Sequence, residues 1–187
     1  MKLLVLSRYD RLGASSRLRM LQYLPALARA GIEADIVPFF DNAYLEALYA
    51  GRRLPLATAG YYLRRMNHLL RAGRRDAIWL EKELLPWLPW GVERRLLPRG
   101  VPLVSDYDDA VFHRYDLHRR RPVRRLLGRK IDGVMAGSAL VMAGNAYLAE
   151  RARAAGAPKV EIVPTVVDAA AYDTAPLPAP DGRPPRS

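Results

Sequence analysis

The sequence contains no cysteine, which excludes disulfide bonds, thiolate chemistry and zinc sites built on cysteine. Long apolar runs are also absent. The N-terminal run Leu3–Leu6 is too short for the core of a signal peptide or for a membrane span. We therefore interpret this run as the first strand of the fold and expect a cytoplasmic protein. Neither G-x-G-x-x-G nor G-x-x-x-x-G-K-[ST] occurs, so the two common phosphate-loop motifs are missing.

Acidic residues are few relative to basic ones, and the formal net charge is +11. The segment Gly51–Arg75 has seven arginines and no acid. The segment Arg114–Lys130 has seven arginines and one lysine, with Asp116 as its one acid. Such surfaces attract phosphates, nucleic acids or anionic lipid headgroups. A solvated surface that is simply rich in arginine is an equally good interpretation.

The composition fits one soluble domain with an apolar core, because 50% of the 187 residues are hydrophobic and 26% are charged. The end of the chain differs, since five of the fourteen residues from Thr174 to Ser187 are proline. We expect a domain over residues 1–168. We expect a proline-rich linker or tail over residues 169–187 that leads toward a missing C-terminal domain.

Short apolar runs alternate with helical patterns along the chain. The predicted strands are 3–6, 32–38, 77–82, 101–105, 139–144 and 160–165. Helices are predicted at 16–31, 44–49, 54–71, 122–136 and 145–155. A further short helix is predicted to begin at 92 and to be stopped by Pro98 and Gly100. Pro25 should kink the first helix, and Ser15 or Ser16 can cap it. The pattern predicts an α/β protein: a Rossmann-like, doubly wound, mostly parallel sheet of about six strands with helices on both faces.

The helix predicted at 122–136 is basic and amphipathic. Its inward residues should be Val123, Leu126, Leu127, Ile131 and Val134. A basic helix of this kind could hold the chain on an anionic membrane, at the inner face.

Ligands of an open parallel sheet bind beyond the carboxyl ends of its strands. Four polar loops are predicted there, after strands one, three, four and five. The first contains Gly13 and precedes a helix start with Arg17 and Arg19. A glycine permits close approach of the backbone, and a helix start offers free N–H groups, so this loop suits an anion such as a diphosphate.

Three acids, Asp106, Asp108 and Asp109, follow the fourth predicted strand. Asp106 and Asp108 form a D-x-D pattern that could hold a divalent ion. The stretch "DYDDAVF" also resembles the first motif of haloacid dehalogenase-type phosphatases, with Ala110 in place of the usual threonine. Asp106 would then be the nucleophile and Asp108 the general acid/base. Alternatively, these acids cap the following helix and pair with nearby arginines.

Four stretches together resemble one family: "GASSRLRMLQYLPALARAGIEADIVPFF", "DYDDAVF", "AGNAYLAERA" and "VPTVVDAAAY". They are similar, in order and spacing, to the N-terminal domain of GT-B glycosyltransferases of family 4, and the resemblance runs from Met1 to about Tyr172. It implies a Rossmann-like, acceptor-binding half of a retaining glycosyltransferase. The donor-binding half would be a second Rossmann-like domain, supplied in trans if it is a separate chain.

The resemblance implies a role for several residues. Gly13 would lie near the donor diphosphate, and Ser16, Arg17, Asp106 and Asn145 would contact donor or acceptor. Asp108, six residues after Pro102, stands where many members carry a histidine that faces the reacting sugar, so Asp108 and Asp109 are the candidate catalytic residues. Asp168 would lie at the hinge between domains.

The resemblance also implies the partners. These are a nucleotide-sugar donor and a hydroxyl acceptor on a glycan, lipid or small molecule, with no metal and no cofactor required. Because the residues that hold the diphosphate belong to the second domain, we expect little or no transfer by this chain alone. The alternatives are the phosphatase and a non-enzymatic, basic anion-binding module, for which we do not favour nucleic acid as the partner.

Overall fold

A computed structural model describes residues 1–52 and 55–167. Its strands form one parallel six-stranded sheet in the order β2-β1-β3-β4-β5-β6. The strands are β1 (Lys2–Leu6), β2 (Glu33–Ile36), β3 (Ala77–Glu81), β4 (Leu103–Tyr107), β5 (Leu140–Ala143) and β6 (Val160–Ile162). This confirms the predicted Rossmann-like α/β architecture. All six predicted strands are present among the described residues.

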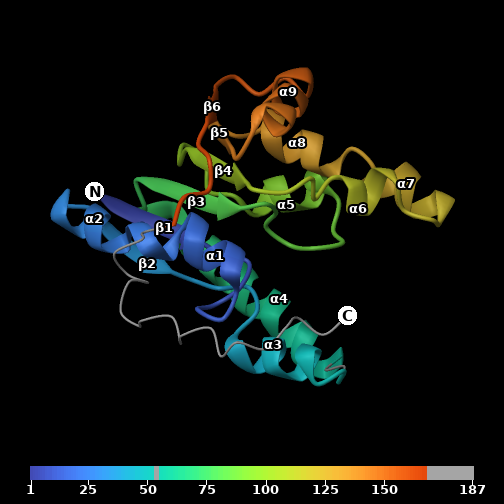
Figure 1. Cartoon of the computed structure of the whole chain (residues 1–187), viewed down its shortest axis with the longest axis horizontal. Coiled ribbons are helices and arrows are strands. Elements are labelled where there is room, and N and C mark those ends of the chain that lie inside the picture. The colour runs from blue at the N-terminus through green and yellow to red at the C-terminus, as the bar shows by residue number, and fades with distance from the viewer. Residues whose placement is uncertain (53–54, 168–187) are drawn as a thin grey trace, which may run out of the picture.

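Helices surround the sheet (Figure 1). The helices that precede β3 in the chain are α1 (Ala14–Arg19), the 3-10 turn η1 (Leu21–Tyr23), α2 (Leu24–Arg29), α3 (Asn42–Tyr49), α4 (Pro55–Leu70) and the 3-10 turn η2 (Ala72–Arg74). Those that follow β3 are α5 (Trp90–Leu96), α6 (His113–Asp116), α7 (Arg121–Leu127), α8 (Lys130–Ala136) and α9 (Ala146–Ala154). Figure 1 shows α7 projecting at one end of the molecule.

The sheet has an apolar layer on each face because its central strands are buried on both sides. On one face, Leu3, Val5 and Trp79 pack against Met20 and partners from η1 and α2. On the other face, two further clusters join the sheet to helices. One contains Leu69 of α4 and Val134 of α8, and the other contains Ile131 of α8 and Leu148 of α9. Helices on both faces confirm the doubly wound arrangement.

The parallel register brings the carboxyl ends of neighbouring strands together. Glu81, the last residue of β3, pairs with Asp106 in β4, and Tyr107 at the end of β4 pairs with Ala143 at the end of β5. The loops that follow these strands therefore leave the sheet side by side.

The first predicted helix is not continuous, which corrects the prediction of one kinked helix over 16–31. It is divided at Met20 into α1, η1 and α2, and Pro25 lies in the first turn of α2, where the missing N–H is harmless. The capping prediction is also wrong. Gly13 is the N-cap of α1, and the Ser15 and Ser16 hydroxyls bond to carboxylates from other loops.

The helix predicted at 122–136 is two helices, α7 and α8, separated at Gly128 and Arg129. The break changes which side chains face inward. Leu127 and Ile131 are buried as predicted, whereas Leu126 is 68% exposed. The short helix α6 was not predicted. Its four residues are too few to show a helical period in the sequence.

Within the described ranges, no helix is both long and apolar enough to cross a membrane. Asp168 and the proline-rich segment 169–187 lie outside the described residues.

Candidate functional site

The loop after β1 folds tightly before α1 begins. Tyr9 forms an isolated parallel bridge with Phe40, and the Gly13 backbone N–H donates to Asp10 O at 2.9 Å. A Cβ atom on Gly13 would lie 2.3 Å from Tyr9 Cβ, so no larger residue fits without a shift of the loop. Gly13 therefore packs against Tyr9 of its own loop. This packing sets the start of α1, where Ser15 and Ser16 lie.

Glu81, at the end of β3, accepts hydrogen bonds from the β1 loop and from α1. The donors are the Arg8 backbone N–H at 2.7 Å, the Ser15 hydroxyl at 2.9 Å and the Ser16 hydroxyl at 2.6 Å. Ser16 is fully buried, and its oxygen also accepts from the Tyr9 backbone N–H. Glu81 thus joins the first and third strands where a ligand of such a sheet would bind.

Ser15 extends this contact to β4, because its hydroxyl also lies within hydrogen-bond distance of Asp108 Oδ2. A hydroxyl has one proton, so Ser15 donates to Glu81 or to Asp108 at any one time. This shared donor couples the two carboxylates.

Lys82 completes the link between β3 and β4. Its Nζ lies 2.9 Å from Asp108 Oδ1 and 2.9 Å from Asp109 Oδ2. Burial opposes the charge on Lys82, but attraction by Asp108 and Asp109 outweighs it and raises the pKa of Lys82. Lys82 has a φ of 65°, a left-handed conformation that costs a side-chain-bearing residue about 1–2 kcal/mol. This strained conformation occurs at the residue that binds the loop after β4 through Asp108 and Asp109, which we call the acidic loop.

Asp108 and Asp109 are the carboxylates of this loop that reach the surface. Their side chains are 20% and 61% exposed. Burial alone would favour the neutral form of Asp108, yet Lys82 and the Ser15 hydroxyl lower its pKa. Asp108 is therefore an ionised acceptor held by Lys82 and Ser15, beside the more exposed Asp109.

Asp106 has a different environment, although it is two residues from Asp108. It is 1% exposed, and its Oδ1 lies 2.7 Å from Arg19 Nη2 and 2.8 Å from Arg19 Nε. Burial raises the pKa of Asp106 to about 6 despite Arg19. Arg19 also donates to the Val163 carbonyl, so the pair holds α1 and the segment after β6 to the sheet.

The loop after β5 borders the acidic loop. The Gly144 backbone N–H donates to Tyr107 O at 2.8 Å, and a Cβ on Gly144 would lie 3.3 Å from Asp108 Cα. The next residue, Asn145, is exposed and caps α9 by accepting from the Leu148 N–H at 3.0 Å. Asn145 thus follows a residue that borders the acidic loop, but its own side chain already has a capping role.

The Arg17 side chain has its hydrogen bond with the loop after β1, at Arg11. It is exposed, donates to the Arg11 carbonyl at 3.1 Å, and lines a cavity of about 590 Å³ together with Asp10 and Arg11. Of the sequence-predicted residues, Ser16 and Asp108 belong to one connected network, and Asp109 joins it through Lys82. Gly13, Arg17, Asp106 and Asn145 have separate contacts.

A buried charged cluster lies beneath the site. Glu83 Oε2 is 2.6 Å from Lys130 Nζ and accepts from the Tyr115 hydroxyl at 2.6 Å, and its Oε1 is 3.1 Å from Arg8 Nη1. Burial would raise the pKa of Glu83, but Lys130, Tyr115 and Arg8 together lower it. Glu83 thereby fixes the loop after β3 against α8 and α6.

The sequence predicts a polar loop after the third strand, which is Glu81–Glu83, but not the partners of its side chains. Glu81, Lys82 and Glu83 each bind different elements, and Lys130 reaches the cluster from α8, 47 residues later. Nothing in the local pattern of α8 marks Lys130 as buried, since lysine is usually exposed. The interpretation of the acids as helix caps is wrong, because the N-cap of α6 is Phe112 and no side chain caps it.

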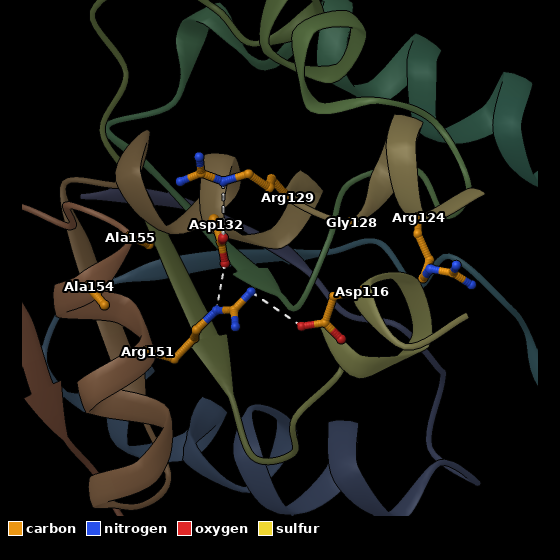
Figure 2. Close-up of a pocket in the computed structure, with 8 residues that line it drawn as sticks. All are labelled: Asp116, Arg124, Gly128, Arg129, Asp132, Arg151, Ala154 and Ala155. Carbon is orange, nitrogen blue, oxygen red and sulfur yellow. Dashed lines mark hydrogen bonds and ion pairs between the residues drawn. The ribbon is translucent and has the colours of Figure 1, made fainter. Parts of the chain in front are cut away.

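A second group of charges surrounds a cavity of about 520 Å³ between α6, α8 and α9 (Figure 2). Arg151 Nε lies 2.8 Å from Asp132 Oδ1, and Arg151 Nη2 lies 3.4 Å from Asp116 Oδ2. In Figure 2 the Arg124 side chain points away from these three residues. Arg151 thereby connects α9 to α6 and α8, and both aspartates of the cavity are already paired with arginine.

In the part of the chain that the structure describes, no group of three or more His, Asp or Glu side chains is arranged to hold a metal ion. No known protein-family model matches this sequence, and a search of curated proteins finds no match either.

Proposed function

We propose that this chain is the acceptor-binding domain of a retaining glycosyltransferase of the GT-B, family 4-like type. A nucleotide sugar would be the donor and a hydroxyl group the acceptor. The donor-binding residues would come from a second Rossmann-like domain, in the same protein or in trans.

The observation that carries the proposal is the fixed position of Asp108 beside the exposed Asp109. Both carboxylates lie 2.9 Å from the Lys82 ammonium, and Ser15 bonds Asp108 from the opposite loop. An ionised carboxylate accepts hydrogen bonds in several directions, which suits it to neighbouring sugar hydroxyls. The site also lies at the carboxyl edge of a parallel sheet, where ligands of this fold class bind.

In this function, Asp108 would accept a hydrogen bond from a hydroxyl of the bound sugar, and the more exposed Asp109 would accept one from the acceptor molecule. Lys82 would position both carboxylates. Stabilising the leaving diphosphate requires cationic groups or N–H donors facing it, and this need is the reason to assign that task to a second domain.

The geometry gives less support to a phosphatase. A nucleophilic aspartate must reach the phosphorus atom. Asp106 is 1% exposed and is occupied by Arg19, so an external phosphate cannot approach its carboxylate without breaking a buried ion pair.

Saturation-transfer NMR with a panel of neutral saccharides and hydroxylated glycosides tests the proposal. We expect at least one saccharide to bind the full chain. Asp109→Asn should weaken that binding by about tenfold, because it removes one charge-assisted hydrogen bond. The matched control is Glu33→Gln, which removes an exposed carboxylate at the amino edge of the sheet.

Two results would overturn the proposal. One is the absence of binding by every saccharide tested. The other is binding that Asp109→Asn and Glu33→Gln leave equally unchanged. Efficient sugar transfer by this chain alone would contradict the assignment of the donor site to a second domain.

A further inference from the structure

The segment 117–129, which includes α7, forms a basic protrusion at one end of the molecule (Figure 1). Six arginines of this basic protrusion are exposed: Arg119, Arg120, Arg121, Arg124, Arg125 and Arg129. The side chains of Arg119, Arg120, Arg121 and Arg125 have no hydrogen bond or ion pair with any residue in the described ranges. This distinguishes them from arginines such as Arg19, which are paired inside the fold.

The acids closest in sequence leave Arg119, Arg120, Arg121 and Arg125 without a countercharge. Asp116 pairs with His113 and Arg151, and Asp132 pairs with Arg151 and Arg129. Arg121, Arg124 and Arg125, together with Pro122, line an open hollow on α7. Such a hollow lined by guanidinium groups fits phosphate oxygens.

Large apolar side chains project from the same segment. Leu117 is 70% exposed and Leu126 is 68% exposed, and within α7 it is the neighbouring Leu127 that is buried. Nearby, Trp87 is 47% exposed and has its ring edge-on to His118, with ring centroids 5.8 Å apart. Contacts to the phosphate backbone of a nucleic acid come from charged and polar groups, so this binding does not require exposed leucines beside the arginines. Exposed leucines add directly to insertion into a lipid interface.

We propose that the basic protrusion binds bilayers that contain anionic phospholipids. The unpaired arginines contact headgroup phosphates, and Leu117 and Leu126 enter the boundary between headgroups and acyl chains. Trp87 lies close enough to report this contact, and tryptophan is favoured at that depth. The inference does not depend on the proposed sugar-transfer function, because it uses none of the residues of the acidic loop.

Vesicle co-sedimentation of the full chain tests the proposal. One set of vesicles is phosphatidylcholine alone, and the other is an equimolar mixture of phosphatidylcholine and phosphatidylglycerol. We expect salt-sensitive binding to the second set and a blue shift of Trp87 fluorescence that Trp87→Phe removes. Each arginine near a charged bilayer contributes about 1 kcal/mol, or about fivefold, so Arg121→Gln/Arg125→Gln should weaken binding about 30-fold.

The matched control is Arg71→Gln/Arg74→Gln, which removes the same charge from exposed arginines at the end of α4 and in η2. Leu117→Ser/Leu126→Ser keeps all arginines and should also weaken vesicle binding at least tenfold. The proposal fails if anionic vesicles do not bind or if both arginine pairs weaken binding equally. It also fails if the leucine variant binds vesicles normally while the arginine variant loses binding to both vesicles and single-stranded DNA. The protrusion would then be a general polyanion-binding surface.

Discussion

The Arg19 guanidinium and the Asp106 carboxylate form an ion pair that connects α1 to the end of β4 inside the protein. Nη2 lies 2.7 Å from Oδ1, and the two side chains are 3% and 1% exposed. The same guanidinium reaches the backbone after β6 at Val163. One side chain therefore secures three segments that are far apart in the sequence.

Replacing Arg19 should strongly destabilise the fold in a pH-dependent way. Arg19→Met leaves the Asp106 carboxylate buried without a cation, which costs about 3–5 kcal/mol in the free energy of unfolding. Burial raises the pKa of Asp106 to about 6 even with Arg19 present, so below that pH protonation of Asp106 should reduce the loss. Urea unfolding on both sides of this pKa measures the difference.

Arg17 offers a matched control for this variant, because it is an exposed arginine of the same helix. Arg17→Met should change the free energy of unfolding by less than about 0.5 kcal/mol. Equal losses for Arg19→Met at high and low pH would show that the pair is not the source of the effect.

The left-handed conformation of Lys82 predicts an unusual order of two substitutions. Lys82→Ala and Lys82→Gly both remove the ammonium that binds Asp108, but only glycine is relaxed at a φ of 65°. We expect Lys82→Gly to be the more stable variant by about 1 kcal/mol in urea unfolding. The same pair at Arg95 in α5 should give the opposite order, since glycine disfavours a helix. Parallel results at the two positions would refute the role of strain.

Glu93 should make the protein lose stability as the pH rises through neutrality. Burial raises the pKa of Glu93 from 4.5 to about 7, although Lys130 Nζ, 3.0 Å away, opposes this shift. The neutral form is therefore favoured by folding, and its contribution is complete below about pH 4.5 and lost as the pH passes about 7. The free energy of unfolding measured across this interval should fall by a few kcal/mol, because each unit of difference in pKa between the folded and unfolded states corresponds to about 1.4 kcal/mol.

Glu93→Gln tests this origin, because glutamine stays neutral and can still accept from the Leu85 N–H. The fall across the interval should become smaller in this variant, whereas Glu33→Gln, an exposed control, should leave it unchanged. If stability rose with pH over the same interval in the native chain, the raised pKa of Glu93 would be wrong.

The contact between Trp90 and α8 predicts that two helical glycines respond oppositely to alanine. A Cβ on Gly133 would lie 2.4 Å from Trp90 Cδ1, so Gly133→Ala should lower the unfolding free energy by about 1–3 kcal/mol through overpacking. A Cβ on Gly91 in α5 meets nothing within 4 Å, so Gly91→Ala should be neutral or stabilise by up to about 1 kcal/mol. Thermal unfolding distinguishes the two, and a stabilised Gly133→Ala variant would contradict the packing described.

The sequence by itself determined the strands, the order of the elements and the edge of the sheet at which polar side chains gather. Runs such as Leu3–Leu6 are apolar at every position because both faces of a central parallel strand are buried. Local composition is enough to locate such strands. It also located the acidic loop with Asp108 and Asp109, since a loop after a buried strand must lie at the sheet edge.

Only the tertiary structure decided which of the acids is available. Asp106 and Asp108 are two residues apart, yet one is buried with Arg19 and the other reaches the surface beside Lys82. Their partners come from α1 and from the end of β3, and no local pattern specifies which distant cation meets which carboxylate. The break at Gly128 and the exposure of Leu126 are likewise results of packing that helical periodicity cannot show. Periodicity records the average direction of a face, whereas long-range contacts set where each side chain finally lies.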